Sequence, residues 1–96
     1  MDTPIPDRAW KLLEPEGAWT QGASARDSAH RVLPYWDKRA CQWCTLGAIG
    51  VAYPPLRLLD VEQRLRRELP QGIAVWNDTP ERTQAEVVAL LKSLDI

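Results

Sequence analysis

A single apolar stretch, Ala40 to Tyr53 (ACQWCTLGAIGVAY), constrains the fold of this chain more than any other feature. Only Gln42 and Thr45 in it are polar, a pattern typical of a helix that is buried on most sides. A chain of 96 residues has room for one hydrophobic core, so the other elements must pack around this segment. We therefore expect an all-α, or nearly all-α, single domain over residues 1–96, a bundle of four to five helices around a central apolar helix at 40–53.

The same stretch contains small residues that would ordinarily weaken a helix. Gly47 and Gly50 each cost about 1 kcal/mol relative to alanine unless packing compensates for them. Because a glycine lets a neighbouring backbone come close, we expect another helix to cross the central helix at these positions.

Capping residues and prolines predict the elements of the N-terminal half. Asp7 can cap a short helix that runs through Glu14. Ser24 and Asp27 have the spacing of a capping box, which favours a short helical turn. A proline interrupts the pattern that follows, so we expect a loop or a brief extended piece at Val32 to Trp36.

The C-terminal half has clearer signals. The segment from Pro55 to Leu69 predicts an amphipathic outer helix. Proline suits the first helical position, and an apolar stripe on one side of the helix is opposite i, i+4 ion pairs on the other side. The short apolar run from Ile73 to Trp76 predicts one extended segment. Thr83 and Glu86 fit a capping box ahead of the last helix, with Thr79 as the alternative start.

Composition limits the class of protein and its partners. Hydrophobic residues make up 45% and charged residues 26% of the chain, which is typical of a folded domain. Twelve basic and thirteen acidic residues give a net charge of -1, so the chain lacks the positive field that draws proteins to nucleic acids or anionic membranes. No run reaches the length of a membrane span, and the first ten residues do not resemble a secretory signal. We expect a cytoplasmic protein with no membrane partner and no strong nucleic-acid interaction.

Two cysteines, Cys41 and Cys44, have the spacing of a redox dithiol or of half a zinc site. A structural zinc needs four ligands, and outside this pair the chain offers only His30 and carboxylates. A thioredoxin-like motif belongs to a parallel-sheet context, which the sequence does not predict. We therefore interpret both cysteines as buried, reduced and metal-free, and we expect no metal and no cofactor.

Asp27, Ser28 and His30 are the residue types of a hydrolytic triad. Neighbours in sequence seldom have the geometry of a triad, and no glycine-rich elbow surrounds Ser28. Acid–base catalysis would depend on carboxylates, and none of them lies in an apolar setting that would separate their pKa values. We expect a surface loop here and a protein that is not an enzyme and has no catalytic residues.

Two polar loops carry the candidate binding residues. Both lie beside predicted helix starts and combine tryptophan with amide, carboxylate and guanidinium groups. Such groups form either a polar network that fixes the loops or a recognition site. We expect the two loops to meet in space, with Arg26 or Arg82 paired to Asp27 or Asp78. The candidates are Trp19, Gln21, Arg26, Asp27, Trp76, Asn77, Asp78 and Arg82.

Three motifs occur in order along the chain: W-T-Q-G-A-x-A-R-D at Trp19 to Asp27, C-x-L-G-A-I at Cys44 to Ile49, and W-N-D-x-P-x-R-T-x-x-E-V at Trp76 to Val87. With them, the chain from Trp19 onward resembles a family of small, functionally uncharacterised proteins found in bacteriophages, prophages and some bacteria. His30 and Pro34 depart from the glycine-containing turn expected after Ala-Arg-Asp. The resemblance implies a phage-linked accessory protein and transfers no catalytic residue.

We therefore expect a non-catalytic phage or prophage accessory protein that binds a protein partner, for example to inhibit a host defence system such as CRISPR. The alternative is a small-molecule or nucleotide-binding protein, or a minor enzyme, whose pocket is formed by the Trp76-Asn77-Asp78 and Arg26-Asp27 loops. A deep cleft lined by both loops would favour the alternative. A flat surface with an exposed tryptophan would favour protein binding.

Overall fold

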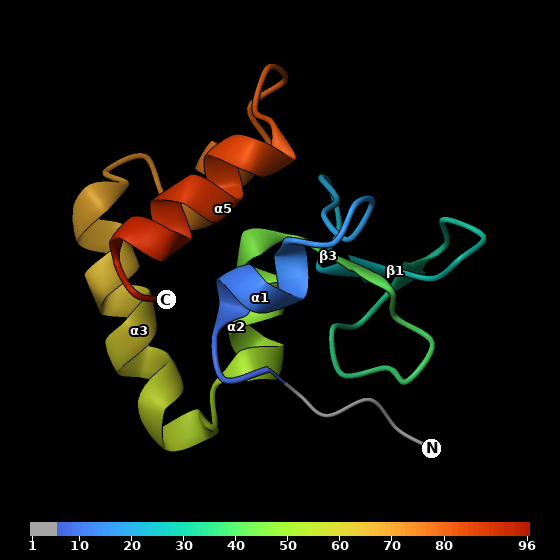
Figure 1. Ribbon diagram of the computed structural model, residues 1–96, viewed down its shortest axis with the longest axis horizontal. Helices are drawn as coiled ribbons and strands as arrows, with labels where there is room; N and C mark the ends of the chain where they lie inside the picture. The colour runs from blue at the N-terminus through green and yellow to red at the C-terminus, as the bar shows by residue number, and fades with distance from the viewer. Residues whose placement is uncertain (1–5) are drawn as a thin grey trace.

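The computed structural model describes residues 6–96 and contains both helices and short strands (Figure 1). One helix comes first, three strands follow, and four helices complete the chain. The elements are α1 (Ala9–Leu13), β1 (Ala25–Arg26), β2 (Val32–Leu33), β3 (Gln42–Trp43), α2 (Thr45–Ala52), α3 (Pro55–Glu68), α4 (Ile73–Asn77) and α5 (Gln84–Ser93).

The three strands form an antiparallel sheet in the order β2-β1-β3. Ala25 in the middle strand pairs with Leu33 on one side and with Trp43 on the other. The predicted all-α class is therefore wrong, and the fold is mixed α/β. Strands of two residues leave no alternation for a sequence pattern to detect, and each of them is stabilised by pairing with a distant segment rather than by local preference.

Helix α2 is the element that the others surround, but it begins at Thr45 rather than at Ala40. It contacts α1, α3, α4 and β3, and Ala48 and Ile49 are fully buried. Cys44 is its N-cap, with an extended backbone and a sulfur that accepts the backbone N–H of Gly47 at 3.3 Å. Gln42 and Trp43, which precede Cys44, form the half-buried strand β3 instead, because they pair with β1.

The glycines of α2 allow close approach, as predicted, but not to another helix. A Cβ atom at Gly47 would overlap the backbone carbonyl of Ser24, just before β1. At Gly50 it would lie 2.6 Å from the ring of Tyr35. The sheet and the loop after β2 are therefore seated directly on α2, where a larger side chain would push them away.

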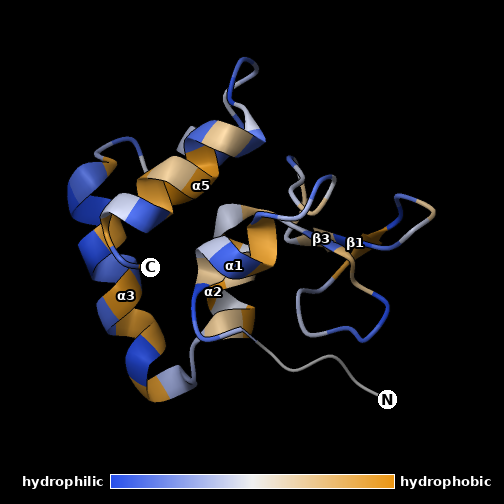
Figure 2. Cartoon of the chain, viewed as in Figure 1, coloured by the Kyte–Doolittle hydropathy of each residue, from blue (hydrophilic) through white to orange (hydrophobic). Residues whose placement is uncertain are grey.

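The outer helices follow their sequence signals. Helix α3 begins at Pro55, as predicted, and buries Val61 and Leu65. The capping box of Thr83 and Glu86 is present at the start of α5. Figure 2 shows hydrophobic and hydrophilic residues alternating along the α3 ribbon, as expected for an amphipathic helix with one face on the core.

The last residue described, Ile96, has a fully buried side chain. Its carbonyl oxygen accepts the backbone N–H of Ala9 at 2.6 Å and the hydroxyl of Tyr53. An ion pair between Arg8 and Asp95, 3.0 Å long, lies beside these bonds. The segment after α5 therefore joins the start of α1 to Tyr53, directly after the C-terminal end of α2.

Helix α1 and the segment that follows it depart in part from expectation. Helix α1 begins after Arg8, and Asp7 does not cap it but accepts the ammonium of Lys11 at 2.7 Å. The predicted helical turn at Ser24 to Asp27 is instead strand β1. The predicted extended piece is confirmed in part, because β2 occupies its first two residues.

The segment Ile73 to Trp76 is helical rather than extended. Its β-branched residues favour a strand, but Ile73 and Trp76 are buried together on one side of a short helix. Tertiary packing therefore overrides local preference at α4. Within residues 6–96, no helix is both long enough and apolar enough to cross a membrane.

Candidate functional site

The two polar loops singled out in the sequence lie against each other, as predicted. The indole N–H of Trp19 donates to the side-chain oxygen of Asn77 at 2.7 Å. The Gln21 amide donates to the backbone oxygens of Asn77 and Thr79 at 2.9 and 2.8 Å. The backbone N–H of Gly22 donates to Asp78 at 3.0 Å. We call this contact between residues 19–22 and 77–79 the loop junction.

Asn77 is the centre of the loop junction and is 1% exposed. Besides the Trp19 indole, its side-chain oxygen accepts the backbone N–H and the hydroxyl of Thr45, at 3.0 and 2.7 Å. Its amide group donates to the carbonyl of Thr20 at 3.1 Å and to Asp78 at 2.9 Å. Every hydrogen-bonding position of this side chain is occupied, so Asn77 fixes the first loop, the start of α2 and the end of α4 to one another.

The predicted ion pairs between the two loops are not formed. Arg26 donates to the hydroxyl of Thr20 and to the backbone oxygens of Gln21 and His30. Asp78 accepts the Gly22 and Asn77 donors described above. Arg26 therefore stabilises its own loop through backbone oxygens. The two loops are joined by amide groups rather than by opposite charges.

Arg82 and Trp76 form a pair within the second loop. The guanidinium carbon of Arg82 lies 4.2 Å from the centre of the Trp76 ring, and its Nε donates to the Trp76 carbonyl at 3.0 Å. A further bond of 3.0 Å joins Arg82 to Glu86 in the capping box of α5. Trp76 is buried beneath this arginine, so it is not the exposed aromatic group that a recognition surface requires.

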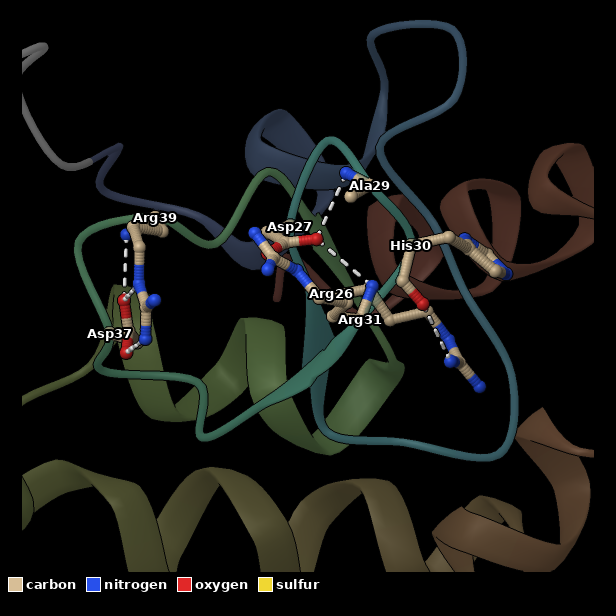
Figure 3. A network of polar contacts seen from close by, with 7 residues as sticks. All are labelled: Arg26, Asp27, Ala29, His30, Arg31, Asp37 and Arg39. Atoms are coloured by element: carbon tan, nitrogen blue, oxygen red, sulfur yellow. Dashed lines mark hydrogen bonds and ion pairs between the residues drawn. The ribbon is translucent and has the colours of Figure 1, made fainter.

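Asp27 closes the turn between β1 and β2 (Figure 3). Its carboxylate accepts the backbone N–H groups of Ala29 and Arg31, both at 2.9 Å, and the Arg31 guanidinium at 2.8 Å. These bonds, the Arg31 backbone bond first, hold the pKa of Asp27 below its usual range. His30 takes the left-handed conformation, with φ of 64°, where a glycine-containing turn was expected.

The arrangement around Asp27 does not form a triad. The carboxylate is occupied by Arg31 and the turn, and His30 Nδ1 lies 3.0 Å from the amide oxygen of Gln42. The side chains that would act as orienting acid and base therefore have other partners.

The cysteines differ from each other. Cys44 is buried, as predicted, and burial raises the pKa of its thiol. Cys41 is exposed, which corrects the prediction that both are buried. The difference arises because Cys41 precedes the short strand β3, whereas Cys44 begins the buried helix. Among residues 6–96, no three His, Cys, Asp or Glu side chains gather in a way that could hold a metal ion.

A tryptophan outside the predicted set has the most exposed aromatic side chain: Trp36, at 71%. It lies between β2 and β3 in a segment of two successive turns, closed by the bonds Asp37 N–H to Pro34 O and Ala40 N–H to Asp37 O, both 3.1 Å. We call residues 34–40 the Trp36 loop. The sequence signal was an excess of tryptophan over phenylalanine, which indicates incomplete burial but does not say which tryptophan is exposed.

The Trp36 loop is held in place from two sides. The Tyr35 ring lies on Gly50 of α2 and meets the Trp36 ring edge-on, with centroids 4.9 Å apart and planes at 87°. Asp37 accepts the backbone N–H of Arg39 at 2.8 Å and its guanidinium at 2.9 Å. The Arg39 guanidinium, followed by the backbone bond, lowers the pKa of Asp37 to about 2.

These features define a small α/β domain whose two polar loops are joined to each other and whose third loop presents a supported tryptophan. The chain belongs to a family of unknown function, DUF6197, whose model matches residues 5–94. No significant match is found among curated proteins or among solved structures.

Proposed function

We propose that the protein is a non-catalytic accessory protein that binds a protein partner through the Trp36 loop. The observation that carries the proposal is that Trp36 is 71% exposed although its loop is fixed by neighbouring residues. Tryptophan and arginine are the residues that contribute most to binding energy at protein interfaces. Trp36 is the most exposed of the aromatic side chains, and a partner that covered it would remove its apolar surface from water.

The support beneath Trp36 favours binding over chance exposure. The two turns, the Asp37 to Arg39 bonds and the Tyr35 ring order the loop before any partner arrives. A partner would therefore not have to supply the free energy that orders this segment. The Trp36 loop thus has the properties of a preformed contact.

The alternative of a small-molecule pocket at the two polar loops has less support. The Gln21 side-chain nitrogen and both polar atoms of the Asn77 amide are bonded across the loop junction or to Thr45, so these atoms are not free to bind a ligand. A ligand site needs converging polar groups that are unoccupied before binding. The eight residues proposed as a binding site remain candidates, but their contacts are those of a structural network.

The biological setting that we propose is a phage or prophage. The motifs at Trp19, Cys44 and Trp76 that carry the family resemblance support this setting, and the small size of the domain suits an accessory role. A partner from a host defence system such as CRISPR is the specific form of the proposal. Binding alone would be sufficient for inhibition, which agrees with an expected lack of catalytic residues.

Affinity capture with three versions of the chain tests the proposal. Tagged wild-type protein, Trp36→Ala and Leu56→Ala would be incubated with lysate of a host cell. Leu56 on α3 is 97% exposed and provides a matched control for the loss of an exposed apolar side chain. We expect Trp36→Ala to weaken capture by about 2 kcal/mol or more, about thirtyfold in affinity. Equal capture by all three versions would contradict the proposal.

A defence assay tests the specific setting. Expression of the wild-type chain in a host with active CRISPR immunity should restore plating of a targeted phage, and Trp36→Ala should not restore it. Restoration by neither version, together with Trp36-dependent capture, would retain protein binding and reject this class of target.

A further inference from the structure

Charge is unevenly distributed along the chain. The segment from Arg26 to Arg39 contains four basic and two acidic residues, a net charge of +2. The remaining residues contain eight basic and eleven acidic side chains, a net charge of -3. The overall charge of -1 therefore conceals a positive region formed by the strands β1 and β2 and their loops.

The two carboxylates of this region are less accessible than the guanidinium groups they bind. In the pair of Asp27 with Arg31, the carboxylate side chain is 5% exposed and the guanidinium side chain 71%. In the pair of Asp37 with Arg39, the values are 21% and 66%. Each ion pair therefore presents its positive member to the solvent, and positive potential is directed outward.

The two ion pairs lie on successive loops of the chain, one before β2 and the other after it. Figure 3 shows one on the loop after β1 and the other on the Trp36 loop between β2 and β3. The Asp37 carboxylate, followed by a smaller contribution from Asp27, raises the pKa of the Arg39 guanidinium. Lys38, two residues after Trp36 in the sequence, is also exposed. Trp36 therefore lies in a loop whose exposed charged side chains, Lys38 and Arg39, are positive.

We propose that the partner presents an acidic surface, with aspartate or glutamate side chains around an apolar pocket that receives Trp36. This inference rests on the proposed function and specifies the chemistry of the partner. Carboxylates of the partner would pair with Arg31, Lys38 and Arg39 at the rim, where exposed charges accelerate association and determine which partners are accepted. The pocket would supply most of the affinity, because a central buried tryptophan dominates such interfaces.

A protein partner suits this surface better than a nucleic acid. Sequence-independent binding of single strands uses a positive groove that follows several phosphates, with successive aromatic platforms. Here one exposed tryptophan projects from a loop, and the Tyr35 ring beside it meets its edge and is itself only partly exposed. Val32, also exposed on β2, adds apolar area and no stacking surface.

Selection from a displayed library of random peptides tests the chemistry. Wild-type protein would be the bait. A counter-selection against the Trp36→Ala variant would remove peptides that bind elsewhere on the chain. We expect the remaining peptides to be acidic and to contain an aromatic or large aliphatic residue. Their binding should weaken when salt is raised, because exposed charge pairs are screened.

Two charge reversals distinguish a local effect from an effect of total charge. Lys38→Glu reverses a charge in the Trp36 loop. Arg67→Glu makes the same change in net charge at an exposed position of α3. We expect Lys38→Glu to weaken binding of the selected peptides by about tenfold and Arg67→Glu to leave it nearly unchanged. Equal effects of the two variants would overturn the proposal.

The remaining outcomes separate this inference from the function on which it rests. Selection of neutral or basic peptides whose binding depends on Trp36 would overturn the inference of an acidic partner and would leave the proposal of protein binding in place. Displacement of the selected peptides by an oligothymidylate at similar concentration would assign the surface to single-stranded nucleic acid and overturn the inference. The absence of any Trp36-dependent peptide would overturn the inference and count against the proposed function as well.

Discussion

The indole Nε1 of Trp19 donates a 2.7 Å hydrogen bond to the side-chain oxygen of Asn77, a residue 58 positions further along the chain. This bond joins the first and third sequence motifs, and the other bonds of Asn77 join both of them to the start of α2. The motifs are therefore parts of one structural unit. Their residue types are explained by the hydrogen bonds that a buried amide can make.

Replacement of Asn77 tests this unit. Asn77→Ala should destabilise the fold by about 3 kcal/mol, because it leaves the donors of Trp19 and Thr45 buried and unpaired. Asp78→Ala is the control, since it removes two bonds from an exposed side chain and should cost about 1 kcal/mol. Urea denaturation would measure both values. A smaller loss for Asn77→Ala than for Asp78→Ala would contradict a central role for Asn77.

The glycines of α2 should respond differently to alanine. Gly47→Ala brings a methyl group onto the Ser24 backbone, and we expect a loss of about 1 to 3 kcal/mol or more. The atoms nearest to the methyl group of Gly50→Ala belong to the Tyr35 ring, which can turn aside. Thermal unfolding should therefore show the larger change for Gly47→Ala, and an equal or larger change for Gly50→Ala would contradict this difference between a backbone and a side-chain contact. Gly50→Ala should instead shift the indole signal of Trp36 in an NMR spectrum.

The ion pair of Asp37 and Arg39 makes the Trp36 loop sensitive to acid. The Asp37 pKa is about 2 in the fold, below the ordinary value of 3.8. The stabilising effect of the pair is thus fully present above the ordinary value and is lost as the pH falls through the folded pKa. Carbon NMR of the Asp37 carboxyl should show a midpoint near 2, and Arg39→Gln should return it toward 3.8. An unshifted midpoint in the wild-type protein would contradict the pairing.

Thiol reactivity should separate the two cysteines. Cys41 is exposed and Cys44 is buried with a raised pKa, and alkylation requires an accessible thiolate. Iodoacetamide should therefore modify Cys41 in the folded protein and reach Cys44 only after denaturation. Peptide mass spectrometry of the labelled protein would measure both sites. Faster labelling of Cys44 than of Cys41 would be incompatible with a buried N-cap cysteine.

Local signals predicted some elements because the determining contacts are local. The capping box of Thr83 and Glu86 lies within one turn of helix, and Pro55 occupies a position that its own chemistry favours. The sheet could not be predicted in the same way. Gln42 and Trp43 become a strand only because Arg26 and Ala25 lie beside them, and these partners are distant in sequence.

The candidate site was predicted in outline and not in its bonds. Trp, Asn, Asp and Arg beside helix starts indicated that the loops would meet, which is correct. The expected pairing of Arg26 or Arg82 with Asp27 or Asp78 was wrong. Both arginines bond to backbone oxygens instead, and Asp27 is paired with Arg31. The Tyr35 ring rests on Gly50 and meets the Trp36 ring, and this relationship between separate segments is contained in no local pattern.

Site-specific photo-crosslinking tests the central claim most directly. A photoreactive phenylalanine analogue would replace Trp36 in one version and the exposed Leu56 in another, and each would be irradiated in host lysate. The account predicts a discrete crosslinked protein band from position 36, absent from position 56 and removed by excess unlabelled wild-type chain but not by excess Trp36→Ala. No band from position 36, or the same bands from both positions, would contradict binding through the Trp36 loop.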